Sequence, residues 1–99
     1  MVQQLYEYRF DPDVEWADVQ AAIALALLAA ECLHGETEVR LQATHATDAE
    51  TRMCVINGDS DVGRDLNKVF CGFLQHEFGE NAFTVCRTSG SREAAAGVV

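Results

Sequence analysis

Ten consecutive apolar residues, AAIALALLAA at positions 21–30, restrict the possible folds of this chain more than any other feature of its sequence. Alanine and leucine are among the strongest helix formers, so the run predicts a helix. Asp11 followed by Pro12 is a helix start signal, because a side-chain acceptor precedes a residue with a preset φ. Gly35 provides the stop, since glycine is common just after the end of a helix. We therefore predict a helix over residues 12–34.

This predicted helix has two apolar faces. At about 100° per residue, one side of the helical wheel carries Trp16, Val19, Ile23, Ala26, Leu27 and Ala30, and the opposite side carries Val14, Ala17, Ala21, Leu25, Leu28 and Cys32. A surface helix ordinarily has one apolar stripe, so the second one needs a cover. Leaving Leu25 and Leu28 in water forgoes roughly 3–6 kcal/mol of burial, comparable with the whole stability of a small domain. The cover is either the chain's own second helix or tail, or a partner chain.

Charge and cysteine content limit the partners and the compartment. The formal net charge is −9 at pH 7, which argues against nucleic acid and anionic membrane as partners. The apolar run is also too short to span a bilayer, and its flanks are acidic. Residues 1–10 lack the features of a secretory signal. The four cysteines are scattered singly, so we expect free thiols and a cytoplasmic protein.

Strand patterns flank the helix. Residues 2–10 alternate, with Tyr6, Tyr8 and Phe10 on one predicted buried face, and residues 37–46 alternate with Val39, Leu41 and Ala43 inward. The polar residues 47–50 have hairpin length and lead to a third strand over residues 51–56. A turn and helix cap over residues 57–60 precede an amphipathic helix over residues 61–78 and a last strand over residues 83–88.

This order of elements predicts an α+β fold. Two strand-helix-strand units joined by a hairpin form the ferredoxin-like βαββαβ sandwich, in which two helices cover one face of a four-stranded antiparallel sheet. The first and third strands would be central. We expect a single domain over residues 1–88 and a flexible C-terminal tail over residues 89–99. Because both helices need the same sheet face, the second face of the first helix points to solvent or to another subunit.

Familiar binding motifs fail on inspection. Asn57, Asp59 and Asp61 have the oxygen spacing that opens an EF-hand loop, but Val62 replaces its glycine and Lys68 its closing glutamate. A capped turn explains them better. The chain has no C-x-x-C pair, and its cysteines and histidines do not converge in sequence, so we expect no metal and no cofactor.

Two functional hypotheses remain. The first, which we prefer, is a non-enzymatic interaction module, an adaptor or oligomerisation domain, that forms a homodimer or docks another protein. Its contact residues would lie on the outward face of the first helix: Val14, Ala21, Leu25, Leu28 and Cys32. The second is a small enzyme or ligand-binding domain that uses the open face of the sheet, with Glu7, Arg9, Arg40, Cys54 and Cys86 as lining residues. No catalytic residue is assigned, because only a tertiary contact could activate either thiol.

Overall fold

The computed structural model describes residues 4–88. In chain order, the elements are β1 (Leu5–Phe10), α1 (Trp16–His34), α2 (Glu36–Gln42), β2 (His45–Asp48), β3 (Met53–Asn57), α3 (Asp61–Phe78), a 3-10 turn η1 (Glu80–Ala82) and β4 (Phe83–Thr88). The four strands form one open antiparallel sheet in the order β2-β3-β1-β4. The fold is therefore α+β, and β1 and β3 are its central strands, as predicted.

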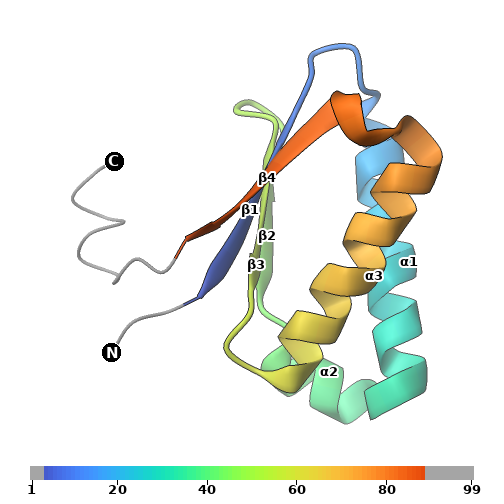
Figure 1. Cartoon of the computed structure of the whole chain (residues 1–99). Coiled ribbons are helices and arrows are strands. Elements are labelled where there is room, and N and C mark those ends of the chain that lie inside the picture. Colours follow the sequence, from blue (N-terminus) through green and yellow to red (C-terminus); the bar gives the residue numbers. More distant parts are fainter. Residues whose placement is uncertain (1–3, 89–99) are drawn as a thin grey trace.

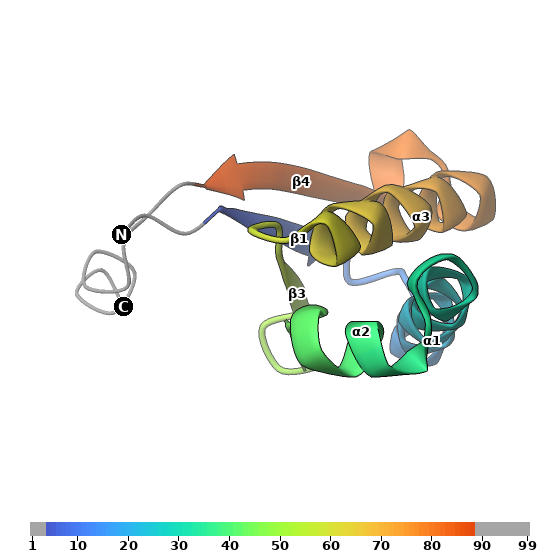
Figure 2. The same ribbon diagram turned by 90° about the horizontal axis from the view of Figure 1, so that it is seen from below.

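The helices lie on one face of the sheet. Figures 1 and 2 show α1 and α3 side by side along that face, with α2 next to the C-terminal end of α1. The main core lies between these two layers. Its largest fully buried side chains include Tyr8 of β1, Ile56 of β3 and Phe70 of α3. The Tyr8 ring stands edge-on to Phe70 with 4.9 Å between ring centroids, and this geometry is favourable for aromatic pairs.

Alternation along β1 places its residues as the sequence predicts. Tyr8 and Phe10 are buried under the helices, whereas Arg9 is exposed on the other face. The Tyr8 hydroxyl donates a hydrogen bond to the Asn67 side chain on α3, so its one polar atom is satisfied inside the core. Burial raises the pKa of Tyr8 because the charged phenolate would lose its hydration.

The first helix starts later than predicted. Residues 12–14 form a turn, in which the Val14 N–H donates to the Asp11 carbonyl at 3.1 Å, and α1 begins only at Trp16. The guanidinium of Arg52 donates to the main-chain carbonyls of Asp11 and Val14 and lies 5.8 Å from the centre of the Trp16 ring. These contacts hold the chain in a turn where the local Asp-Pro signal favours a helix. The predicted end at Gly35 is confirmed, with φ at 92°.

The second predicted strand, over residues 37–46, was wrong for most of its length. Residues 36–42 form α2, and the strand β2 is only His45–Asp48. The inward positions are Val39 in α2 and Ala43 at its C-cap, four residues apart, while Leu41 is 73% exposed. An ion pair between Glu36 and Arg40 (3.6 Å) supports the helix at i,i+4 spacing. Alternating polar and apolar residues over so short a segment fit both periods, and packing on α1 and α3 selected the helix.

The second long helix, α3, begins where β3 ends. The Ser60 hydroxyl caps it by accepting from the Gly63 N–H at 2.9 Å, which confirms the predicted cap. The helix packs closely against the end of β3 at this point, because a Cβ on Gly63 would lie 2.1 Å from the Asn57 carbonyl oxygen. Glycine at that position therefore sets how near α3 can approach the sheet.

Candidate functional site

The outward face of α1 is exposed along its length. Leu25 is 55% exposed and Leu28 57%, and Ala21 and Cys32 on the same face are also exposed. The opposite stripe, Val19, Ala22, Ile23, Ala26 and Ala30, is buried. We call the exposed set Ala21, Leu25, Leu28 and Cys32 the outward face of α1. The two-faced helix expected from the sequence is therefore present, and no segment among residues 4–88 covers its second face.

Val14, the fifth residue of the predicted contact set, does not belong to this face. It is 8% exposed and packs in the main core with Phe10 and Val19. The helical wheel assigned it outward because the helix was expected to start at residue 12. Since Val14 lies in the turn before α1, the helical period does not determine where its side chain points.

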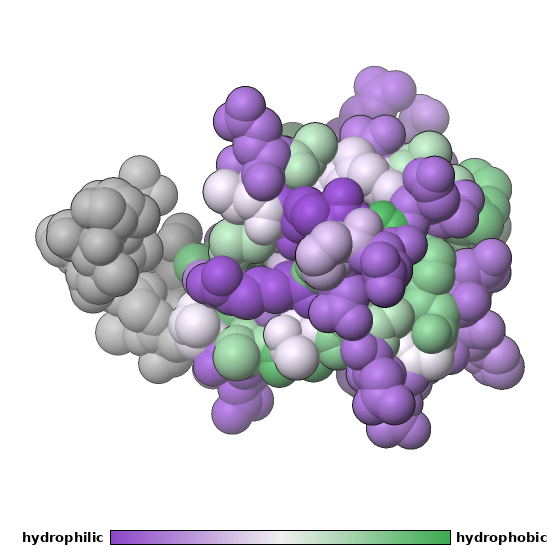
Figure 3. Space-filling model, turned by 90° about the horizontal axis from the view of Figure 1, so that it is seen from above, coloured by the Kyte–Doolittle hydropathy of each residue, from purple (hydrophilic) through white to green (hydrophobic). Residues whose placement is uncertain are grey.

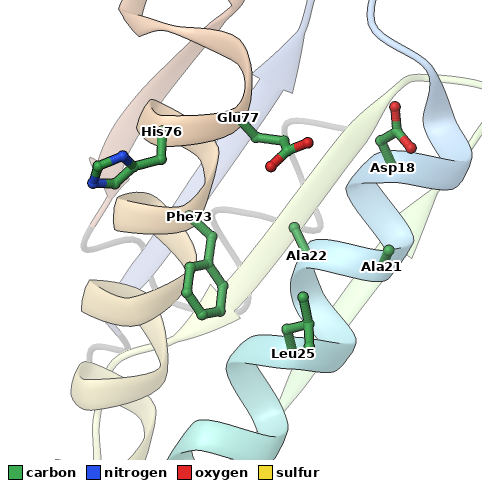
Figure 4. A pocket seen from close by; sticks show the side chains of 7 residues that line it. All are labelled: Asp18, Ala21, Ala22, Leu25, Phe73, His76 and Glu77. Carbon is green, nitrogen blue, oxygen red and sulfur yellow. The ribbon is translucent and has the colours of Figure 1, made fainter.

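A groove runs between α1 and α3 beside this outward face. Its volume is about 420 Å³, and it is lined by Asp18, Ala21, Ala22 and Leu25 of α1 and by Phe73, His76 and Glu77 of α3. Figure 4 shows Phe73 and Glu77 pointing from α3 toward α1, whereas the His76 ring points away from α1. The floor of the groove is therefore apolar, and carboxylates stand at one end of it.

The acidic end continues into a second hollow. A cavity of about 390 Å³ is lined by Asp11, Asp13, Val14, Glu15, Asp18, Glu77, Phe78 and Ala82, and it shares Asp18 and Glu77 with the groove. Figure 3 views the molecule from this end, where α1 begins and α3 ends. Hydrophobic (green) atoms on the helix side of the molecule are bordered there by hydrophilic (purple) ones. The groove is thus an apolar channel with a negatively charged mouth.

Sequence reasoning missed the contribution of α3 to this site. Phe73 belongs to the amphipathic helix that was predicted over residues 61–78, and it received no functional assignment there. It is only partly buried and lines the groove at the margin of the core. Glu77 had no assignment. The available signal was the width of the apolar stripe on residues 61–78, since residues at the edge of a wide stripe border the neighbouring helix.

The open face of the sheet keeps only part of the alternative site. Glu7 pairs with Cys86 on β4 and with Val55 on β3, so these three side chains share the open face with Arg9. Glu7 and Arg9 form an ion pair at 3.8 Å. The other two predicted members are elsewhere. Cys54 is opposite Tyr8 and fully buried under the helices, and Arg40 lies on α2, paired with Glu36.

Because Cys54 and Arg40 do not lie on the open face of the sheet, most of the basis for a reactive-thiol site there is lost. Burial raises the pKa of the Cys54 thiol to about 12, so this thiol is neutral and shielded in the folded protein. Arg40 was assigned to the sheet because residues 37–46 were expected to be a strand. What remains on the open face is an exposed Cys86 next to the Glu7 carboxylate, which is the wrong charge to activate a thiolate.

The turn before α3 uses its polar groups for structure. The Asn57 side chain accepts from the Asp59 N–H at 2.8 Å, and Asp59 accepts from the Gln4 N–H at 2.9 Å. Asp61 pairs with Arg64. Among residues 4–88, no group of three or more metal-ligating side chains converges. His34 instead bonds to Asp65 at 2.8 Å and so joins the end of α1 to the start of α3.

Within the part of the chain that the structure describes, α1 is the one helix long and apolar enough to cross a membrane by length and composition. A helix from the core of a soluble protein passes the same criterion. Five α1 residues belong to the cores, Val19, Ala22, Ile23, Ala26 and Ala30. Moving α1 into a bilayer would therefore dismantle the fold.

Comparison with known proteins adds no family to this description. The chain matches no family model, no curated protein and no solved structure. The groove and the outward face of α1 are therefore the features that bear on its function.

Proposed function

We propose that this protein is a small interaction module that binds a polypeptide, either a second copy of itself or another protein, through the outward face of α1. The observation that carries the proposal is the pair Leu25 and Leu28, each more than half exposed on one side of a helix whose other side is in the core. Covering two such leucines contributes roughly 2–3 kcal/mol, given that about half of each side chain remains to be buried. A contiguous apolar strip beside a groove is the usual form of a polypeptide-binding surface.

The proposed fold assignment is a variant of the ferredoxin-like sandwich. The strand order β2-β3-β1-β4 and the position of α1 and α3 on one sheet face support it. The variation is α2, which occupies chain expected to extend the second strand. We also propose a cytoplasmic location, supported by four unpaired cysteines, since thiols persist in a reducing compartment.

A photo-crosslinking experiment tests this function. A benzophenone side chain replaces Leu28 in one variant and Leu41 in a matched control, because Leu41 is a more exposed leucine (73%) on α2 rather than α1. In irradiated cells that express the protein, the Leu28 variant should give discrete polypeptide adducts, identified by mass spectrometry as a second copy or another protein. The control should not give them.

Two results would contradict the proposal. Adducts of equal yield and identity from both positions would mean that the outward face of α1 has no special role. Adducts with lipid only would make the face a membrane contact. A Leu25→Glu change in the Leu28 probe variant should also suppress the specific adducts, because it places a charge in the apolar strip.

A further inference from the structure

We infer that the groove between α1 and α3 binds a cationic amphipathic helix of another protein. The inference rests on the proposed function and names the class of partner for the same site. It depends on three properties of the described residues: an apolar floor, a negatively charged mouth, and the shortage of available cations on this chain itself.

The floor of the groove suits a helix that carries large apolar side chains. Ala22 points toward α3 and leaves space between the backbones of the two helices, while Leu25 and Phe73 form the walls (Figure 4). Small residues permit a third helix to approach closely, so that its leucines can enter the space between the two helices. The surface of α1 from Asp18 in the groove to Cys32 on the outward face is about 21 Å long at 1.5 Å per residue, which matches a partner helix of about 14 residues.

The mouth of the groove selects for positive charge. The groove and the adjoining hollow together bring five carboxylates to one end: Asp11, Asp13, Glu15, Asp18 and Glu77. Arg52 lies near this end of the groove, but its guanidinium donates to the main-chain carbonyls of Asp11 and Val14 and not to these carboxylates. Lysine or arginine side chains at one end of a bound helix would therefore meet carboxylates that have no cationic partner among the described residues.

Charge also makes a second copy of this chain a poor partner for the groove. Residues 4–88 contain six arginine and lysine residues, and four of them are engaged: Arg9 with Glu7, Arg40 with Glu36, Arg64 with Asp61, and Arg52 with the turn before α1. Two copies would also bring net charges of −9 together. Like charges across an interface suppress association, so complementarity favours a basic partner over a copy.

A lipid surface is disfavoured by the same carboxylates. Inserting the outward face of α1 into the headgroup region would bring Asp18 and Glu77 to the surface of the bilayer. Cytoplasmic leaflets are anionic, and amphipathic helices that bind them carry lysine and arginine on their polar face. The polar border of this groove has the opposite sign.

Peptide binding to the full chain tests the inference. One fluorescent 18-residue helical peptide carries leucines on one face and lysines on the other, and a matched peptide has glutamates in place of the lysines. Fluorescence anisotropy at low salt should give at least a 10-fold lower Kd for the lysine peptide. Asp18→Asn with Glu77→Gln should weaken its binding roughly 3- to 10-fold, because two ion pairs are lost. Leu25→Ser should weaken the binding of either peptide.

A control variant, Glu38→Gln with Glu50→Gln, removes the same number of exposed carboxylates on α2 and in the β2–β3 turn. It should bind the lysine peptide like the unmodified chain. Equal weakening by the two double variants would overturn the inference, since it would mean that net charge alone attracts the peptide.

The remaining outcomes separate this inference from the proposed function. If both peptides bind equally and only Leu25→Ser weakens them, the groove binds polypeptides without the proposed charge selection, and the inference fails alone. It also fails alone if neither peptide binds and light scattering shows a dimer that Leu25→Glu with Leu28→Glu converts to a monomer. Binding to anionic vesicles but to neither peptide would contradict both proposals.

Discussion

Gly63 and Gly72 both lie within α3, and replacing each with alanine should change stability in opposite directions. A Cβ on Gly72 would have no atom within 4 Å, whereas a Cβ on Gly63 would lie 2.1 Å from the Asn57 carbonyl oxygen. Alanine is favoured over glycine inside a helix by about 0.5–1 kcal/mol. Gly72→Ala should therefore raise the free energy of unfolding by that amount.

At Gly63 the clash outweighs this gain. Ordinary Cβ contacts are 3.4–4 Å, so α3 and the end of β3 would have to separate by roughly 1 Å. The Asn57 backbone is held in place, because its N–H donates to the Thr44 carbonyl at 2.9 Å and because Asn57 pairs with Leu5 of β1 in the sheet. Overpacking of this kind costs about 1–3 kcal/mol, and a displaced Ser60 cap adds about 1 kcal/mol. The net loss for Gly63→Ala is then about 1–3 kcal/mol after the helical gain of alanine.

Urea unfolding measures both effects on the same probe. The chain has a single tryptophan, Trp16, packed edge-on against Phe10 with ring centroids 5.8 Å apart, so its fluorescence reports the core. With a urea dependence of about 1 kcal/mol/M, the midpoint should fall by about 1–3 M in Gly63→Ala and rise by about 0.5–1 M in Gly72→Ala. A Gly63→Ala midpoint at or above that of the unmodified chain would refute the close approach of α3 to β3.

Two further predictions concern the buried thiol of Cys54 and the partly buried cation of Arg52. Burial raises the pKa of Cys54 from 9.0 to about 12, so the folded protein keeps the neutral thiol while the unfolded chain ionises above about pH 9. The free energy of unfolding should therefore not depend on this group below about pH 9. Between about pH 9 and pH 12 it should fall by up to about 1.4 kcal/mol per pH unit. Cys54→Ala should reduce this pH dependence of the free energy of unfolding, measured by urea titration. In the unmodified chain, iodoacetamide should label Cys54 only after unfolding. Labelling of Cys54 in the native protein would contradict its burial. Arg52→Ala should lower the free energy of unfolding by about 1–3 kcal/mol by removing the hydrogen bonds to the turn before α1. Arg52→Gly should lose about 1 kcal/mol less, since φ at this residue is +56°, and equal losses in the two variants would mean that this backbone carries no strain.

Several elements of the fold could be predicted because their signals are local. The inward side of α1, the cap at Ser60, the stop at Gly35 and the buried face of β1 each depend on residues within one or two turns or a few strand positions. Such patterns act through hydrogen bonds and side-chain periods that neighbouring residues determine on their own. Residues 37–46 were predicted wrongly because the signal there was local but ambiguous: a short alternation of polar and apolar residues fits both the strand period and the helix period.

The candidate site was less predictable, since its walls come from helices far apart in the chain. The exposed face of α1 could be derived from one helical wheel, whereas the contribution of Phe73 and Glu77 depends on how α3 lies against α1. Likewise, the strand face on which Cys54 lies follows from its pairing opposite Tyr8. That register is a property of the sheet, and one residue of slip would reverse it.

The sequence alone determined that the apolar run within the predicted segment 12–34 forms a helix with two apolar faces, because helix propensity and the helical period are properties of consecutive residues. Only the tertiary structure decided whether the rest of residues 4–88 covers the second face, and which side chains border it. Packing against the sheet and α3 covers one face, buries Val14 with it, and gathers Asp18 and Glu77 at the mouth of one groove. Those outcomes depend on distances between segments that are separated by more than fifty residues, and no local pattern carries that information.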